Sequence, residues 1–295
     1  MALIPVTTAC NQRCLFCSAH GRGDSAALPG VLRQITRQAA AGAGGVILSG
    51  GETTFSAHLR RIVAFARAKG LKVELQTNAL TSCYPRAAAR FAALGVAMFN
   101  VNFPSHQGPV NDRITGTKDT LPLRAAGVRN LLAAGAVVRL THIISTLNFR
   151  QLPAFVRYAA ENFPGVKYIQ FSYLKGMGLA MENAWLLPEY KLVSPYLVKA
   201  LAFCARAGVE AVVDHIPPCF LGRFHGRHID FIKVADGRDT ALSRAEKKHL
   251  PACRTCVLRD RCFGPRVEHA AMLKGALLAR PVKKLRSGGS KPHGI

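Results

Sequence analysis

The chain has 295 residues, of which 49% are hydrophobic, enough to bury one large core or two smaller ones. No apolar run approaches the roughly 18–20 residues that a membrane-spanning helix needs. The N-terminus, MALIPVTTAC, lacks the basic stretch and the longer apolar stretch of a secretion signal. These features argue against a membrane or secreted protein and predict a soluble, cytoplasmic one with no membrane partner.

The formal net charge is +24, from 40 Lys and Arg residues against 16 Asp and Glu. Such an excess usually indicates a polyanionic partner, either nucleic acid or an acidic surface. An arginine-heavy genome, together with an acidic partner such as a peptide, would explain the same charge. The arginines are scattered and aromatic residues make up only 7% of the chain, so nucleic-acid binding is the minority interpretation.

The elements expected along the chain alternate between short apolar strands and amphipathic helices. Strands are predicted at 2–8, 45–49, 72–77, 97–103, 137–145 and 167–173. The Ala/Leu/Arg-rich segments between them, such as 29–43, 56–70 and 123–136, each close at a glycine, as helices often do. This repetition is typical of βα units around a parallel sheet. Six units predict an α/β fold, a partial (β/α)6 TIM-like barrel that is short of the eight units of a closed barrel.

The character of the sequence changes after a last helix-like stretch at 194–208. From 216 onward the chain is rich in Pro, Gly, Cys, His and Arg, and its periodicity fades. This composition predicts a smaller domain ordered by a bound metal. We therefore expect a barrel at 1–209, this small C-terminal metal-ordered domain at 210–279 and a basic, flexible tail at 280–295.

Seven of the nine cysteines fall into two sets, a pattern that favours metal or cluster ligation over disulfides in a reducing compartment. The first cluster has the spacing C-x3-C-x2-C, at Cys10, Cys14 and Cys17. Thiolates at this spacing suit a [4Fe–4S] cluster, in which three cysteines leave one iron open. An incomplete ligand set distinguishes a reactive metal site from a structural one. A zinc site completed by a histidine such as His20 is the alternative.

Cys10, Cys14 and Cys17 resemble the signature of the radical S-adenosylmethionine (SAM) superfamily, which lies in the loop after the first strand. The resemblance implies that the open iron chelates the amino and carboxylate groups of SAM. One electron then cleaves SAM to methionine and a 5′-deoxyadenosyl radical, which abstracts a substrate hydrogen. Phe16 matches the aromatic residue usual before the third cysteine; it would pack near the adenine or serve only in the core.

Other residues resemble the family at the carboxyl ends of predicted strands, where barrels place their active sites. The resemblance implies that these residues lie at the SAM site: Gly50, Gly51, Glu52, Thr77, Asn78 and Asn102. Asn100 shares a strand face with Asn102, but Asn102 is nearer the strand end. Either asparagine could instead be a satisfied structural residue. The fifth strand offers further candidates among which the sequence does not choose: Thr141, His142 and Asn148.

A second set of cysteines follows the change of composition, at Cys219, Cys253, Cys256 and Cys262. Four thiolates complete the ligand set of one cluster, either iron–sulfur or zinc. Their spacing resembles the auxiliary-cluster extensions of radical SAM enzymes, called SPASM or, when shorter, twitch domains. Arg266 stands where a full SPASM domain has a further cysteine. We therefore expect one auxiliary [4Fe–4S] cluster, with a zinc knuckle as the alternative.

The resemblance implies a reaction class but not a substrate. Enzymes of this type modify peptides by oxidation or crosslinking, or dehydrogenate small molecules, and take electrons from a donor such as flavodoxin or ferredoxin. Asp214 and His215 could supply a base near the substrate, or be a strand-end pair with no chemistry. Cys83 and Cys204 lie outside both cysteine sets, and Cys204 is expected in the core.

Two rival functions stay open from the sequence. The first is RNA modification, in which the basic charge would bind phosphates with a contribution from Lys283, Lys284 and Arg286. The second is a non-enzymatic nucleic-acid-binding protein with two zinc knuckles. Iron–sulfur clusters are coloured and zinc sites are not, so the metal distinguishes this second alternative.

Overall fold

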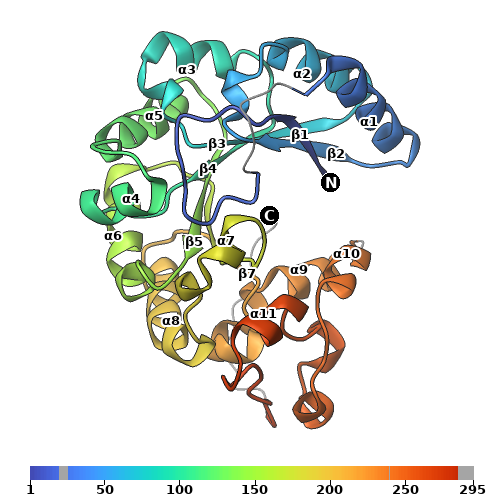
Figure 1. The fold of residues 1–295 in the computed structure, drawn as a ribbon, viewed down its shortest axis with the longest axis vertical. Helices are drawn as coiled ribbons and strands as arrows, with labels where there is room; N and C mark the ends of the chain where they lie inside the picture. The colour runs from blue at the N-terminus through green and yellow to red at the C-terminus, as the bar shows by residue number, and fades with distance from the viewer. Residues whose placement is uncertain (20–25, 239, 285–295) are drawn as a thin grey trace. The chain divides into compact units, whose positions relative to one another are not determined.

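The computed structural model describes residues 1–19, 26–238 and 240–284. Its fold is α/β, with seven parallel strands in one sheet in the order β1 to β7 (Figure 1). The strands are β1 Ala2–Thr7, β2 Gly45–Gly50, β3 Lys72–Thr77, β4 Met98–Asn102, β5 Val138–Ile144, β6 Tyr168–Tyr173 and β7 Ala211–Asp214. The strands β1 and β7 are the two edges, so the sheet is open. The predicted partial barrel and its six strands are confirmed, and β7 is one strand more than was expected.

Helices follow the strands, as βα units require. Those of the barrel are α1 Leu28–Ala40, α2 Leu59–Ala68, α3 Pro85–Ala92, α4 Gly108–Thr115, α5 Leu121–Ala133, α6 Leu152–Asn162, α7 Leu179–Glu182 and α8 Tyr190–Arg206. Short helices follow β7, namely α9 Ile229–Ala235, α10 Ala241–Ala245 and α11 Val267–Met272. The helices α1 and α2 end where Gly42 and Gly70 adopt positive φ values of 71° and 77°, which are strained for other residues.

The chain divides into two compact units. The first consists of Met1–Thr141 and Glu161–Lys167. In this unit β1 to β4 pair in parallel, for example Val46 with Val73 in β2 and β3. Alternate strand residues such as Leu48, Leu75 and Val101 are fully buried. Each such side chain contributes about 1.5–3 kcal/mol to stability, which explains why these short apolar runs were recognisable as buried strands.

The second unit consists of His142–Ala160 and the chain from Tyr168 onward. The strands β6 and β7 pair in parallel, from Ile169 with Ala211 to Ser172 with Asp214. After β7 the chain forms mostly short 3-10 and α-helical turns, as the loss of periodicity from 216 predicts. Among the described residues, none of the helices combines the length and apolar character needed to cross a membrane.

Candidate functional site

The three N-terminal cysteines lie in one loop directly after β1. Cys10 is exposed, whereas Cys14 and Cys17 are half-buried, and all three are free thiols. The N–H of Cys17 donates to the carbonyl of Cys14 at 3.0 Å, which closes a turn between these two residues. The structure thus gathers the predicted cluster ligands in one short segment.

The end of α4 fixes this cysteine loop. The backbone N–H of Arg13 donates to Thr115 at 2.8 Å, and that of Leu15 donates to Ile114 at 2.9 Å. Gly116 follows with a φ of 62°, and a Cβ at this position would lie 2.8 Å from the carbonyl oxygen of Arg13. Only glycine allows this approach without displacing the loop.

Burial disfavours ionisation of two of these thiols, Cys14 and Cys10. The pKa of Cys14 is raised to about 12, mainly by burial and partly by the neighbouring Cys17 and Cys10, although Arg124 opposes the shift. Although Cys10 is the most exposed of the three residues, partial desolvation of its sulfur raises its pKa as well. Since a metal ligand must be the thiolate, a bound metal centre is needed to draw the protons off these residues.

Gly50 and Gly51 are tightly enclosed by the loop that leads to Cys10. A Cβ on Gly50 would lie 2.0 Å from the carbonyl oxygen of Thr7, and one on Gly51 would lie 2.2 Å from that of Ala9. The N–H groups of Gly51 and Glu52 donate to these two carbonyls at 2.7 Å each. The resemblance implied that these glycines lie at the SAM site; the structure gives a packing reason for them, because the ends of β1 and β2 approach each other closely here.

The carboxylate of Glu52 is buried and joins the ends of β2 and β3. Its Oε1 atom accepts hydrogen bonds from the hydroxyls of Thr54 and Thr77, both at 2.7 Å. Its Oε2 atom accepts from the N–H of Asn78 at 2.7 Å. The side chain of Asn78 donates to Asn11, one residue after Cys10, at 2.6 Å. The predicted residues Glu52, Thr77 and Asn78 are therefore hydrogen-bonded to one another next to the cysteine loop.

The two asparagines of β4 differ in whether their side-chain oxygens have a hydrogen-bond partner, a question that the sequence left open. Asn100 is buried, and its side-chain oxygen accepts a hydrogen bond from Thr141. The Oδ1 atom of Asn102 is buried and has no hydrogen-bond partner among the described residues. Buried polar atoms are nearly always hydrogen-bonded, so this oxygen fits a site that a polar ligand completes.

Arg124 on α5 is a site residue that the sequence analysis missed. Its side chain is fully buried, and it donates to the backbone carbonyls of Asn102 at 2.5 Å and Asn78 at 3.3 Å, and to Gln12 Oε1 at 3.1 Å. Burial lowers its pKa to about 10, while nearby Cys14 favours the charged form. The guanidinium is therefore charged at neutral pH, and its Nε atom has no partner within the described chain.

The structure also places the remaining candidates of this region. Phe16 is buried, in agreement with either of its predicted roles. His142 is buried beside the rings of Phe155 and Phe171. Asn148 accepts from the N–H of Ser145 at 2.8 Å and so shapes the turn after β5. His20, the possible fourth zinc ligand, lies outside the described residues.

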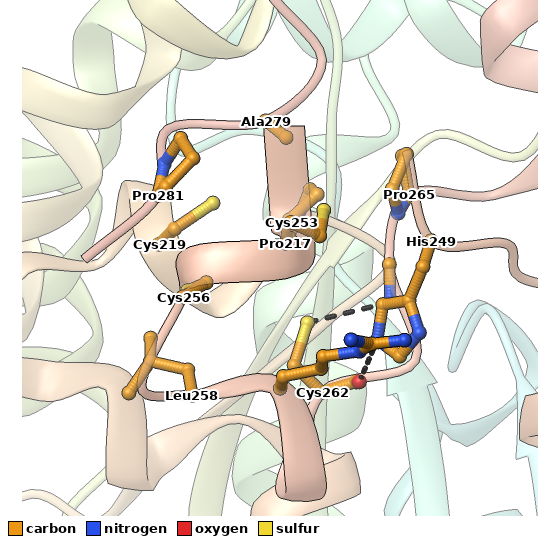
Figure 2. A pocket seen from close by; sticks show the side chains of 12 residues that line it. Pro217, Cys219, His249, Cys253, Cys256, Leu258, Cys262, Pro265, Ala279 and Pro281 are labelled. Atoms are coloured by element: carbon orange, nitrogen blue, oxygen red, sulfur yellow. Dashed lines mark hydrogen bonds between the residues drawn. The ribbon is translucent and has the colours of Figure 1, made fainter. Parts of the chain in front are cut away.

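In the second unit, the four C-terminal cysteines line one small pocket (Figure 2). They come from two separate parts of the chain: Cys219 from the turn after β7, and Cys253, Cys256 and Cys262 from the segment before α11. The pocket is otherwise lined mainly by apolar groups, including Leu258. The predicted auxiliary ligands are thus assembled at one place.

Three of these sulfurs already accept backbone hydrogen bonds. The N–H groups of Arg280, Val282 and Gly264 donate at 3.3 Å to the sulfurs of Cys219, Cys256 and Cys262, respectively. Burial raises the pKa of Cys219 to about 11 and that of Cys262 to about 12. Such N–H groups stabilise thiolates that ligate a metal. In the part of the chain that the structure describes, no group of three or more His, Cys, Asp or Glu side chains is spaced for a single metal ion.

The loop that carries Cys253, Cys256 and Cys262 is closed at its base by Lys247 and Arg266, which pair as an antiparallel bridge. Both side chains are buried: Lys247 donates to Asp230 at 2.6 Å, and Arg266 donates to Glu246 at 2.6 Å. Arg266, which replaces the further cysteine of a full SPASM domain, therefore takes part in ion pairs at the base of the loop.

Asp214 and His215, the candidate base pair, lie at the end of β7 in this charged region. His215 is buried with a positive φ of 65°, and its Nδ1 atom lies 3.1 Å from Asp214 and 3.4 Å from Arg266. Burial lowers the pKa of His215 well below its ordinary value, and the cations Lys175 and Arg266 lower it further. The pair fits the structural alternative, and its role as a base stays a prediction.

The two cysteines outside both sets are also placed. Cys204 on α8 is buried, as expected, and burial raises its pKa to about 12. Cys83 is half-buried in a short 3-10 turn.

Together these features define an open α/β barrel with a metal-binding cysteine loop after its first strand. The loop, the buried cation Arg124 and the unsatisfied oxygen of Asn102 fit an anionic cluster and a polar cofactor. The model of the Radical SAM superfamily matches residues 4–159, and the chain belongs to this superfamily. The resemblance to this superfamily seen in the sequence is therefore confirmed, and membership in a family of enzymes argues against the non-enzymatic alternative.

Several relatives agree with this assignment. The chain is 26% identical over 183 residues to the Fe-coproporphyrin III synthase of Methanosarcina barkeri (strain Fusaro / DSM 804), covering 60% of this chain and 45% of the relative. It is 25% identical over 230 residues to the PqqA peptide cyclase of Methylorubrum populi (strain ATCC BAA-705 / NCIMB 13946 / BJ001), covering 75% and 58%. The chain thus spans about half the length of these curated relatives.

A solved structure shares the fold. The native anSMEcpe with bound AdoMet and Kp18Cys peptide superposes with a TM-score of 0.61 at 13% sequence identity, over 82% of this chain and 67% of that chain. This similarity supports the open-barrel architecture.

Proposed function

We propose that the chain reductively cleaves SAM and abstracts a hydrogen atom from a peptide or a small molecule. The observation that carries this proposal is the loop of Cys10, Cys14 and Cys17, held beside the fully buried Arg124. When bound, the [4Fe–4S] cluster and SAM would supply one-electron cleavage to methionine and a 5′-deoxyadenosyl radical. The cysteines would hold three irons and leave the fourth for SAM.

The residues around the loop would bind and orient this pair. The Arg124 guanidinium provides a buried positive charge for an anionic group, and Asn102 Oδ1 provides an acceptor. Gly51 and Glu52 fix the loop through their backbone hydrogen bonds, and Asn78 does so through Asn11. Gly50 would allow the close approach to Thr7, and Thr77 would hold Glu52 in place. Phe16 would cover an apolar face of the cofactor.

We propose a second [4Fe–4S] cluster, ligated by Cys219, Cys253, Cys256 and Cys262. The backbone N–H groups directed at three of these sulfurs support it, because ligating thiolates are generally hydrogen-bonded. In this proposal residues 1–209 carry the SAM reaction, residues 210–279 carry the auxiliary cluster and residues 280–295 form a basic tail.

A peptide is the substrate class that we favour. The name of one relative is PqqA peptide cyclase, and the solved anSMEcpe structure contains a peptide. A small molecule is the alternative, in keeping with the name Fe-coproporphyrin III synthase. A flavodoxin or ferredoxin would supply the electron, and the nine free cysteines fit the reducing cytoplasm.

RNA modification remains a second candidate because of the charge of +24. Lys283 and Lys284 are exposed, as phosphate contacts require, while Arg286 lies outside the described residues. If RNA is the substrate, its affinity will fall steeply with salt, in proportion to the number of phosphates contacted. Salt-independent or undetectable RNA binding would contradict this candidate.

Iron and acid-labile sulfide, measured after anaerobic reconstitution, test the proposed clusters. We expect about eight irons per chain in the wild type and about four in the triple variant Cys10→Ala/Cys14→Ala/Cys17→Ala, since each [4Fe–4S] cluster contributes four. Zinc in place of iron would overturn the proposal. Four irons in both proteins would overturn only the assignment of a cluster to the N-terminal loop.

A further inference from the structure

The segment of residues 279–282, which we call the strap, passes along the pocket of the four C-terminal cysteines. Ala279 and Pro281 line this pocket (Figure 2). Between and after them, the N–H groups of Arg280 and Val282 donate to the sulfurs of Cys219 and Cys256, both at 3.3 Å. Successive residues of the strap thus alternate between lining the pocket and donating to its sulfurs.

The strap is held in this position by contacts of its own. The N–H of Val257 donates to the carbonyl of Val282 at 2.9 Å, so Val282 is bonded in both directions to the Cys256 turn. The Val282 side chain packs on a small cluster that contains Phe231 and Leu258, and Ala279 is buried. The packing of Ala279 and Val282 therefore fixes the positions of the two N–H groups. The Arg280 side chain is exposed and takes no part in this packing.

Hydrogen bonds of this kind change the energy of a redox centre. An N–H dipole directed at a thiolate sulfur stabilises negative charge there. Reduction by one electron makes an iron–sulfur cluster more negative, so these bonds favour the reduced form and raise the reduction potential. A proline at the same position would lack the N–H and lose this effect.

We propose that the strap tunes the auxiliary centre: the N–H groups of Arg280 and Val282 raise its reduction potential, so that it accepts an electron more readily. This inference rests on the proposed auxiliary cluster. It assigns positioning residues to a part of the chain that the sequence predicted to be a mobile tail from residue 280. The electron comes from dithionite in the experiment below, and from a reduced substrate intermediate or donor protein in turnover.

The test is a reductive titration, monitored by electron paramagnetic resonance, in the background Cys10→Ala/Cys14→Ala/Cys17→Ala, in which only the auxiliary cluster can form. Arg280→Pro and Val282→Pro remove one N–H each, and the matched controls Arg280→Ala and Val282→Ala keep it. We expect each proline variant to titrate at a lower potential than its alanine control, with additive shifts in the double variant. Equal potentials within both pairs would overturn the role of the strap.

Iron content separates the possible failures. If the background protein holds no iron, the proposed auxiliary cluster itself is wrong. If only the proline variants lose iron, the proline ring itself disturbs the site and a milder change is needed. An α-hydroxy acid introduced at position 280 by nonsense suppression replaces the backbone amide with an ester and so removes the N–H without adding a ring. The control is the protein with the ordinary amide and the same side chain at position 280. A lower potential for the ester supports the proposal, and an unchanged potential overturns it.

Discussion

Arg124 donates a hydrogen bond of 2.5 Å to the backbone carbonyl of Asn102, which puts a fully buried guanidinium at the carboxyl end of β4. The same side chain reaches Gln12, between Cys10 and Cys14, at 3.1 Å. One residue of α5 thereby ties a strand end to the cysteine loop. Its charge lies close enough to Cys14 to lower the pKa of that thiol, against the larger effect of burial.

We predict that Arg124→Met loosens the cysteine loop. The substitution leaves the buried acceptors Asn102 O and Gln12 Oε1 without their donor, which costs about 1–3 kcal/mol each. Urea denaturation of the apoprotein should show this loss in the free energy of unfolding, and anaerobic reconstitution should yield fewer irons. Arg129→Met is the matched control, because Arg129 lies on the same helix with its side chain exposed. Equal stability of the two variants would contradict the prediction.

Gly51→Ala should displace the cysteine loop. The new Cβ would meet the carbonyl oxygen of Ala9 at 2.2 Å, whereas Gly44 has open space around it. Overpacking of this kind typically costs about 1–3 kcal/mol. A thermal unfolding scan should therefore give a lower midpoint for Gly51→Ala than for Gly44→Ala, together with reduced iron in the N-terminal cluster. A Gly51→Ala protein with full stability and full iron content would show that the loop tolerates the shift.

The sequence predicted those parts of the molecule whose structure depends on neighbouring residues in the chain. The strand β2 is a mostly buried apolar run, and β3 alternates the buried Val73 and Leu75 with polar residues. Gly42 and Gly70 end helices that their periodicity predicts. The cysteine sets were recognisable by spacing alone. β7 was not counted as a strand, because its four residues lie within a short apolar run next to the change of composition.

Other features depend on contacts between distant parts of the chain. Arg124 looks like one more arginine of a basic protein; only folding shows that it is buried against Gln12, 112 residues earlier. The strap residue Arg280 donates to Cys219, 61 residues away. Arg124 has one weak local signal, because it stands among apolar residues of a predicted helix.

Stability should fall in acid through His228. Burial lowers the pKa of this residue to about 4, with Asp230 opposing the shift and Lys247 adding to it. The unfolded chain, with an ordinary pKa near 6.5, therefore binds the proton more tightly. The stability that neutral His228 contributes is complete above pH 6.5 and is lost as the pH falls toward 4. The loss between pH 7 and 4.5 is about 2–3 kcal/mol.

The variant His228→Asn tests this pH dependence. Asparagine retains an acceptor for the N–H of Asp230, which His228 caps at 3.1 Å, but it does not titrate. We expect the difference in unfolding free energy between pH 7 and 4.5 to be about 2–3 kcal/mol smaller in the variant than in the wild type. The same pH dependence in both proteins would show that other groups are responsible.

The variant Cys256→Ala should show that the two cysteine sets bind their clusters independently. Removal of this ligand is expected to lower the iron content from about eight to about four per chain, while SAM cleavage by dithionite-reduced protein persists, because the N-terminal loop keeps its ligands. Cys83→Ala, outside both sets, should keep about eight irons. Loss of SAM cleavage together with the auxiliary iron would mean that the two sites depend on each other.

The most direct test of the account is the formation of 5′-deoxyadenosine from SAM under anaerobic reduction. Wild-type protein, Cys14→Ala and the control Cys83→Ala would be compared at equal protein concentration. We expect the wild type and Cys83→Ala to form 5′-deoxyadenosine, and Cys14→Ala to form none above the level without enzyme. No product from the iron-loaded wild type, or equal product from Cys14→Ala, would contradict the assignment of radical SAM chemistry to this loop.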